Sequence, residues 1–250
     1  MPDRATFKGE HWKNYVTANK EFAKCTIRAL RQLPRNNTES QLIWVHDYHL
    51  MLTSNWIRKY ADDEGMPCKL GFFLHIPFPP WGDIFRLFPW SHEIYHGKCE
   101  MVGFHVTDYC LNFVDCCQRK LGCRLDRKNL LVEHGDRTVR VRPLPIGIPL
   151  ERFVELAEQA PRVISTNQKI ILGVDRLDYI KGLVHRLLAF EKLMEKVSLL
   201  QIAVPSRTDV KEYQELKEEM DQLASRNNGW FTTPNWSPIR YIYGSLSQDE

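Results

Sequence analysis

The chain has 250 residues, 43% of them hydrophobic and 26% charged, which is the composition of a globular protein with one large or two small domains. The formal net charge of +3 gives no support for a nucleic-acid partner, and no apolar stretch is long enough for a membrane span. The seven cysteines are an odd number without a CxxC pair, which is typical of free thiols in a reducing compartment. We therefore expect a cytoplasmic protein with neither a nucleic-acid nor a membrane partner.

In the first half of the chain, short apolar runs alternate with longer stretches of helical periodicity. Apolar runs without polar alternation indicate strands that are buried on both faces, as in parallel sheets covered by helices. The expected strands are 42–45, 70–76, 101–106 and 139–143, and the expected helices are 50–60, a turn or two from 84 to 88, and 109–121.

The same alternation continues in the second half of the chain. A strand at 170–174 precedes a helix at 183–197, whose apolar residues recur every three or four positions and would form one buried face. A strand at 199–204 precedes a second amphipathic helix at 210–223, whose other face is rich in Lys and Glu and is therefore solvated. This order of elements predicts a doubly wound α/β fold.

Two segments are candidates for a domain boundary. One is the Pro/Gly stretch at 143–149, and the other is the polar segment at 161–168. We therefore expect two Rossmann-like half-domains, 1–150 and 151–250.

Polar groups follow several of the expected strands. In doubly wound folds, ligands bind at the carboxyl ends of the strands. The groups in these positions are His46-Asp47, His75, Asp175-Arg176 and Ser206-Arg207. Their common placement predicts a ligand site more strongly than any one of them does alone.

The segment VDRLDYIKG, residues 174–182, carries two cations where a strand turns into a helix. Gly182 permits a tight entry into that helix, whose N-terminus exposes unpaired N–H groups. Together with Arg176 and Lys181, these groups suit a diphosphate. Alternatively, Arg176 forms a structural salt bridge with Asp175 or Asp178. Neither a GxxxxGK[ST] loop nor a GxGxxG turn is present, so a P-loop NTPase and a nicotinamide dehydrogenase are not supported.

The other polar positions each have a functional and a structural interpretation. Asp47 either accepts hydrogen bonds from sugar hydroxyls or caps the following helix. His75, which precedes a proline-rich loop, either contacts a ligand or is a buried core histidine. Arg207 either binds a phosphate or lies on the surface. His46 and His49 are three residues apart but lack a third ligand at a helical spacing, so we expect no metal site.

Six segments follow one another along nearly the whole chain, from about Trp12 to the end: WVHDYHLMLTSNWIR, LGFFLHIPFPPWGDIFRLFPW, MVGFHVTDYCLNFVDC, RPLPIGI, VDRLDYIKGLVHRLLAFEKL and PSRTDVKEYQELKEEM. In this order and spacing they resemble the trehalose-6-phosphate synthase (UDP-forming) family. The resemblance implies the GT-B fold, with two Rossmann-like doubly wound parallel-sheet domains. It also implies retaining transfer of glucose from UDP-glucose to glucose 6-phosphate, which gives α,α-trehalose 6-phosphate and UDP.

The resemblance implies roles for six residues of this sequence. On the donor side, UDP-glucose would be bound by Arg176 and Lys181 at the diphosphate, His75 at the glucose and Leu246 at the uracil. On the acceptor side, glucose 6-phosphate would be bound by Asp47 at the sugar and Arg207 near the phosphate. The catalytic residues would be His75, Asp47, Arg176 and Lys181.

The resemblance also bears on cofactors, partners and completeness. It implies a reaction without a metal or other cofactor, and it leaves open a homo-oligomer and a fused or associated trehalose-phosphate phosphatase. The family's first strand and donor loop would precede Met1, and later acidic residues would follow Glu250. We therefore expect an internal fragment in which both domains are incomplete and which is inactive alone. The 1–150 domain would lie on the acceptor side, and 151–250 would begin the nucleotide-sugar domain.

A second functional hypothesis is a non-catalytic regulatory homologue that binds sugar phosphates or partner subunits. The chain retains all five of the polar residues that the resemblance singles out, and a protein without activity would have no need of them all. The enzyme is therefore the favoured hypothesis.

Overall fold

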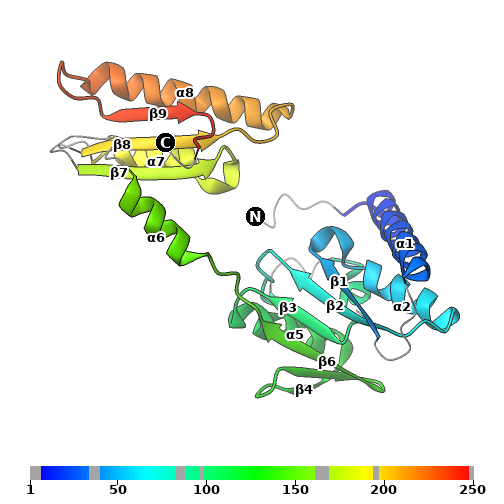
Figure 1. The fold of residues 1–250 in the computed structure, drawn as a ribbon. Coiled ribbons are helices and arrows are strands. Elements are labelled where there is room, and N and C mark those ends of the chain that lie inside the picture. The colour runs from blue at the N-terminus through cyan, green and yellow to red at the C-terminus, as the bar shows by residue number, and fades with distance from the viewer. Residues whose placement is uncertain are drawn as a thin grey trace. The chain divides into compact units, whose positions relative to one another are not determined.

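The computed structural model of the chain describes residues 7–33, 40–82, 88–95, 98–160, 169–193 and 197–247. The chain divides into two compact units, Met1–Ile148 and Pro149–Glu250 (Figure 1). The helical turn expected from residue 84 and the polar segment at 161–168 lie outside the described residues, apart from Phe88.

The first unit is built on a six-stranded sheet of order β1-β2-β3-β6-β5-β4. Its four parallel strands are β1 (Gln41–His46), β2 (Cys68–Leu74), β3 (Met101–Phe104) and β6 (Arg137–Pro143), which overlap the four expected strands. An antiparallel hairpin of β4 (Arg124–Asp126) and β5 (Leu131–His134) extends one edge. This hairpin was not predicted from the sequence, because strands of three and four residues are too short for a pattern of apolar residues to be recognised.

Helices cover the sheet of the first unit. They are α1 (Gly9–Gln32), α2 (Thr53–Asp63), α4 (Ser91–Tyr95) and α5 (Thr107–Leu121), with a 3-10 turn η2 at Tyr48–Leu50. Helix α2 packs on β2, whereas α5 packs on β3 and β6. Helix α1, which we did not predict, is mostly polar and buries only the stripe of Asn19, Ala23 and Ile27. The helix expected at 50–60 begins at Thr53, because the backbone first makes the 3-10 turn.

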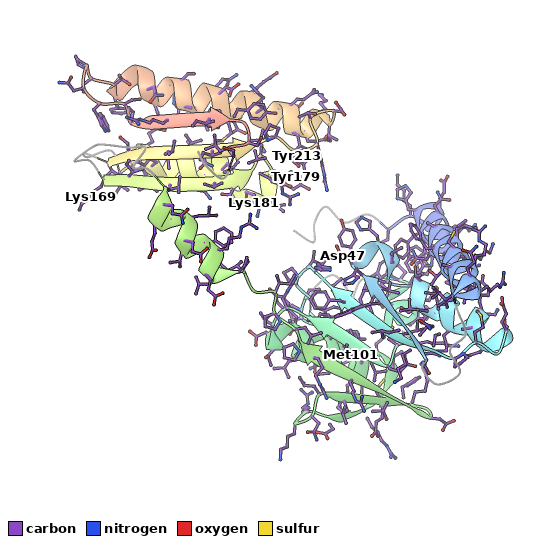
Figure 2. The ribbon with its side chains drawn as sticks, viewed as in Figure 1. Asp47, Met101, Lys169, Tyr179, Lys181 and Tyr213 are labelled. Atoms are coloured by element: carbon purple, nitrogen blue, oxygen red, sulfur yellow. The ribbon has the colours of Figure 1, made fainter. Side chains whose placement is uncertain are left out.

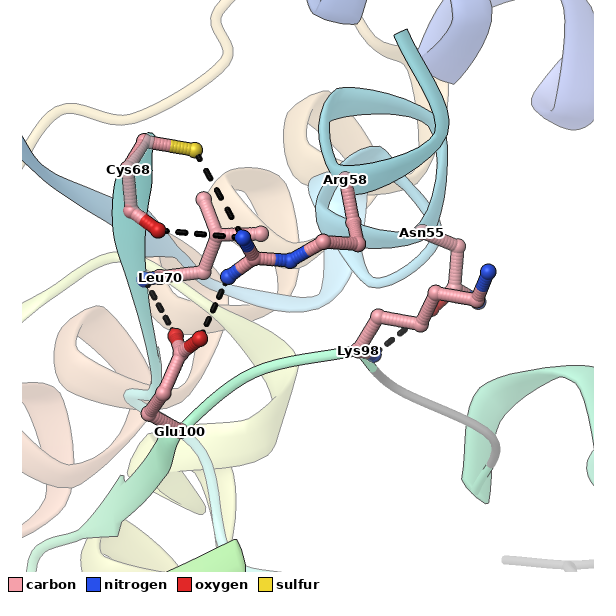
Figure 3. Close-up of polar contacts among 6 residues, drawn as sticks. All are labelled: Asn55, Arg58, Cys68, Leu70, Lys98 and Glu100. Atoms are coloured by element: carbon pink, nitrogen blue, oxygen red, sulfur yellow. Dashed lines mark hydrogen bonds and ion pairs between the residues drawn. The ribbon is translucent and has the colours of Figure 1, made fainter. Parts of the chain in front are cut away.

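A polar cluster ties α2 to the start of β2 and β3 (Figure 3). The carboxylate of Glu100 accepts hydrogen bonds from Arg58 Nη2 and from the backbone N–H of Leu70. Arg58 Nη1 also donates to the carbonyl of Cys68, at 3.0 Å. Because Leu70 is only 1% exposed, its N–H has no solvent to replace the carboxylate.

We expect Glu100→Ala to lower the free energy of unfolding of the first unit by about 1–3 kcal/mol, the usual cost of leaving a buried donor without a partner. The matched control is Glu21→Ala, which removes a carboxylate–lysine pair of 2.7 Å from the exposed surface of α1 and should change stability little. Urea unfolding of the two variants measures the difference. Equal losses in both would contradict a specific role for Glu100.

The second unit contains a three-stranded parallel sheet of order β7-β8-β9. The strands are β7 (Lys169–Arg176), β8 (Val197–Val204) and β9 (Ile239–Tyr243), and the helices are α6 (Leu150–Gln159), α7 (Leu183–Glu191) and α8 (Lys211–Phe231). Helix α7 ends at Glu191, not at the expected Val197, because Val197 is the first residue of β8. Helix α8 begins one residue later and runs farther than expected. No helix among the described residues is long and apolar enough to cross a membrane.

The two faces of the second sheet differ in their cover. Leu199 and Ala203 of β8 share one face, and they lie in one buried cluster with apolar residues of α7 and α8. Leu172 and Val174 of β7 point to the opposite face and are 62% and 56% exposed. The core of this unit therefore lies on one side of the sheet.

Candidate active site

In the first unit, the loops that leave β1 and β2 are tied to each other directly after the strands end. The N–H of Asp47 donates to the carbonyl of Phe73, at 2.8 Å, and the N–H of His75 donates to Asp47 Oδ1, at 3.3 Å. The side chain of Asp47 makes no cap hydrogen bond to the turn that follows it. The side chain of Asp47 therefore binds the residue that follows the neighbouring strand β2, and it does not cap the turn after β1.

Three imidazoles surround Phe73 at this end of the sheet. His46 Nδ1 lies 3.0 Å from His75 Nε2, and the rings of His75 and His105 have centroids 5.7 Å apart. His105 escaped the sequence analysis because the expected strand ran to Val106, whereas β3 ends at Phe104. Within the described ranges, no group of three or more His, Cys, Asp or Glu side chains could hold a metal ion.

In the second unit, the end of β7 and the loop after it carry two carboxylates, each of which is hydrogen-bonded to a group other than Arg176 and Lys181. Asp175 Oδ2 accepts from Arg186 Nη2, at 2.8 Å. Asp178, which is 5% exposed, accepts from the N–H of Ile180 through Oδ1, at 3.1 Å. Both candidate salt-bridge partners of Arg176 are therefore occupied elsewhere.

Arg176 and Lys181 are both exposed, and neither side chain has a hydrogen bond or ion pair to another described residue. Gly182 follows with a φ of 64°, a left-handed conformation that lets the chain turn directly into α7. Figure 2 shows Lys181 and Tyr179 at the end of the sheet opposite Lys169, the first residue of β7. The loop thus presents two uncompensated cations at the carboxyl edge of the sheet, where an anion would bind.

Arg207, in the loop after β8, is linked to the same edge through Tyr213. Arg207 Nη1 donates to the hydroxyl of Tyr213, at 3.1 Å, and this hydroxyl donates to Asp178 Oδ2, at 3.2 Å. Burial, followed by the hydrogen bond to Asp178, raises the pKa of Tyr213, so the hydroxyl stays protonated and keeps donating. Tyr213 lies within the helix expected at 210–223, and nothing in the sequence pattern indicated this bridge.

A cavity of about 290 Å³ opens beside the Arg207 loop. Its lining includes Ser206 and Thr208, which flank Arg207, together with Tyr213 and Tyr243. Leu246 follows β9, is 40% exposed and does not line this cavity. A small polar ligand could therefore enter next to Arg207.

Two of these polar residues have an unusual backbone. Asp47 has a φ of 68° and Arg207 a φ of 49°, in the left-handed region that side chains disfavour. They are two of the three non-glycine residues with a positive φ in the described part of the chain. Such strain is concentrated at functional sites. The backbone conformation therefore indicates a functional role at both positions, which the sequence pattern alone could not show.

Gly173, in β7, gives Arg186 of α7 the space to reach across the strand. Besides Asp175, Arg186 binds Gln201 Oε1 through Nη1, at 2.7 Å, and Gln201 is 1% exposed. A Cβ atom on Gly173 would overlap both Arg186 Nη1 and Gln201 Oε1. The absence of a side chain at Gly173 therefore allows Arg186 to reach both Gln201 and Asp175, and this contact occupies the carboxylate that Arg176 would otherwise bind.

Gly173→Ala should lower the free energy of unfolding of the second unit by about 1–3 kcal/mol, because the methyl group displaces Arg186 from its hydrogen bond with the buried side chain of Gln201. Gly229→Ala in α8 is the control, since its Cβ would meet nothing within 4 Å and alanine favours a helix by up to about 1 kcal/mol. Urea unfolding compares the two. If the two variants had the same free energy of unfolding, the close approach of Arg186 to Gly173 would contribute nothing to the stability of the second unit.

Parallel sheets with polar loops at their carboxyl edges define an α/β protein of the Rossmann-like, GT-B class, as predicted. Residues 1–250 match the model of glycosyltransferase family 20, and the chain belongs to this family.

Individual relatives and solved structures agree with this family. The chain is 38% identical over 266 residues to the UDP-forming alpha,alpha-trehalose-phosphate synthase of Schizosaccharomyces pombe, covering all of this chain and 50% of that protein. The Burkholderia xenovorans enzyme of the same name, in complex with glucose-6-phosphate, is 30% identical with a TM-score of 0.82, over 99% of this chain and 56% of the other.

A structure described as trehalose-6-phosphate from E. coli, bound with UDP-2-fluoro glucose, is 29% identical with a TM-score of 0.81, over 99% of this chain and 56% of that one. The chain spans about half the length of the curated relatives it matches.

Proposed function

We propose that this chain is part of a retaining glucosyltransferase that transfers glucose from UDP-glucose to glucose 6-phosphate and forms α,α-trehalose 6-phosphate and UDP. The observation that carries the proposal is the pair of uncompensated cations, Arg176 and Lys181, at the carboxyl edge of the second sheet. The names of the relatives support the reaction. The complexes of similar proteins with glucose-6-phosphate and with UDP-2-fluoro glucose support the two substrates.

The donor, UDP-glucose, would be held mainly by the second unit. Arg176 offers a planar fork of N–H groups and Lys181 a compact ammonium, which together suit the two phosphates of UDP. Leu246 would pack on the uracil, and His75 of the first unit would contact the donor glucose. In this proposal, residues 151–250 belong to the nucleotide-sugar domain.

The acceptor, glucose 6-phosphate, would be recognised by a carboxylate and a guanidinium. Asp47 would accept hydrogen bonds from the sugar hydroxyls, and Arg207 would bind the phosphate. Residues 1–150 would then form the acceptor-side domain. The left-handed backbone at both residues supports their assignment, because strain of this kind is retained where it serves a ligand.

The chemistry follows from where charge develops. Breaking the bond between glucose and UDP places negative charge on the β-phosphate and positive charge on the sugar ring. Arg176 and Lys181 would stabilise the phosphate, and a single well-aimed donor is worth about 3 kcal/mol of the barrier. The departing phosphate takes the proton of the acceptor hydroxyl while that oxygen bonds to the sugar on the same face. Retention then needs no carboxylate nucleophile, unlike the two-carboxylate hydrolases.

Location and partners are part of the proposal. None of the seven cysteines, all of which the structure describes, forms a disulfide, and six of them are buried, which supports a reducing compartment, and we place the protein in the cytoplasm. A homo-oligomer and a fused or associated trehalose-phosphate phosphatase remain open hypotheses. The regulatory alternative gains no support, because Arg176 and Lys181 keep the free cationic groups that the reaction would use.

The test is a coupled assay of UDP release from UDP-glucose, with and without glucose 6-phosphate. It uses a protein that carries these 250 residues at the full length of the curated relatives. Release that depends on glucose 6-phosphate, with trehalose 6-phosphate as the product, is the expected result. Binding of either sugar phosphate without any turnover would favour the regulatory homologue instead.

A further inference from the structure

The contact between His46 and His75 is the starting point for a further inference. His46 is the last residue of β1, and His75 directly follows β2, the neighbouring strand. Their ring nitrogens, Nδ1 of His46 and Nε2 of His75, lie 3.0 Å apart, which is a normal hydrogen-bond distance. The ring of His46 is further held by Trp44, which stacks on it with centroids 5.4 Å apart.

This contact constrains the chemistry of His75. One hydrogen lies between the two nitrogens, because two would repel each other and none would leave two acceptors face to face. Either Nδ1 of His46 donates to Nε2 of His75, or Nε2 of His75 donates to Nδ1 of His46. In both cases Nε2 of His75 is used within the protein. Nδ1 of His75 has no hydrogen bond to any described residue, so it is the nitrogen left for a ligand.

The backbone of His75 is fixed at the same time. Its N–H donates to Asp47 Oδ1, and the edge of its ring packs against Phe73 with centroids 4.7 Å apart. His46 therefore completes a set of contacts that hold both the main chain and the ring of His75. A ring that is already oriented meets a ligand without a further loss of rotational freedom.

We propose that His46 is a positioning residue, which binds Nε2 of His75, couples the tautomer of that ring to its own and leaves Nδ1 to meet the donor sugar. The functional half of this inference rests on the proposed function, in which His75 contacts the glucose of UDP-glucose. The structural half concerns the free chain alone. The two halves can be tested separately.

The structural half is tested by nitrogen NMR of the histidine side chains in the chain itself. The spectra are recorded at about pH 8.5, well above the ordinary histidine pKa of about 6.5. In the unaltered chain, His75 should show one clearly protonated and one clearly unprotonated nitrogen. In His46→Leu both signals should move towards the average of two exchanging tautomers. His46→Asn, whose amide occupies the position of Nδ1, should restore much of the difference.

His49→Leu is the matched control, since this histidine lies three residues away and its ring contacts Tyr48 instead, with centroids 4.0 Å apart. It should leave the His75 nitrogens unchanged. If His46→Leu also left them unchanged, the proposal would be overturned. If His46→Leu failed to fold, the His46→Asn variant would decide: its His75 nitrogens should keep distinct protonation states, and averaged signals there would count against the proposal.

The functional half is tested by kinetics at the full length of the curated relatives. We expect His46→Leu to lower kcat about tenfold, in the range found for partners that orient a functional imidazole, with the KM for glucose 6-phosphate changed less than about twofold. His46→Asn should recover part of the loss. Altered His75 nitrogens with unchanged kcat would show that His46 orients the ring but that His75 has no part in the reaction, which is a failure of the proposed function and not of the pairing.

Discussion

Lys181→Ala is expected to lower turnover about 100-fold and to weaken UDP binding, because one donor to a developing negative charge contributes about 10²–10³ in rate. Lys181 suits this role because no described residue satisfies its ammonium group, and Gly182 fixes the turn that presents it. The expected loss exceeds that of an ordinary surface lysine, since exposed ion pairs contribute about 0–1 kcal/mol.

Lys169→Ala provides the control for Lys181→Ala. Both lysines are exposed and belong to the same strand–loop unit, but Lys169 lies at the amino end of β7 (Figure 2). Turnover is measured by UDP release, and UDP affinity by calorimetry. Equal UDP affinity in Lys181→Ala and Lys169→Ala would contradict the role of Lys181 at the diphosphate.

Arg207→Ala is expected to raise the KM for glucose 6-phosphate about 30-fold and the KM for UDP-glucose far less. Hydrogen bonds to charged groups contribute about 1.5–3 kcal/mol, and about 2 kcal/mol corresponds to this factor. Tyr213→Phe should produce a weaker change of the same kind, because it removes the hydroxyl that holds Arg207 and keeps the ring.

Initial rates with each substrate varied in turn give both constants. Arg226→Ala is the matched control: this arginine lies on α8, pairs with Glu191 and contacts the ring of Trp230. It should leave both constants near their original values. A larger rise for UDP-glucose than for glucose 6-phosphate in Arg207→Ala would refute the acceptor role of Arg207.

The central strands of both sheets could be predicted from the sequence because a buried parallel strand is a short apolar run without alternation. β2 and β8 are of this kind, with almost every residue buried or half-buried. Helices were harder to predict. Helix α6, which is amphipathic but buries no residue, was not predicted. The end of α7 was misplaced, because the apolar spacing of the helix continues by coincidence into the first residue of β8.

The polar positions at the strand ends could likewise be named from the sequence, because the fold class fixes where ligands bind. Their partners could not. The pairings of Arg186 with Asp175 and of Tyr213 with Asp178 join different elements, so they depend on register and helix placement. A linear pattern contains neither, so only the three-dimensional structure shows that Asp175 and Asp178 bind groups other than Arg176.

Asp47 and Arg207 combine a disfavoured left-handed backbone with side chains that we have proposed to bind the acceptor. Glycine adopts this conformation without steric penalty, so replacing either residue by glycine would relieve strain of about 1 kcal/mol while deleting the side chain that the proposed function assigns to the acceptor. A selection for thermostability alone would therefore favour glycine at these two positions, and would stabilise the fold while removing the side chains proposed to bind substrate.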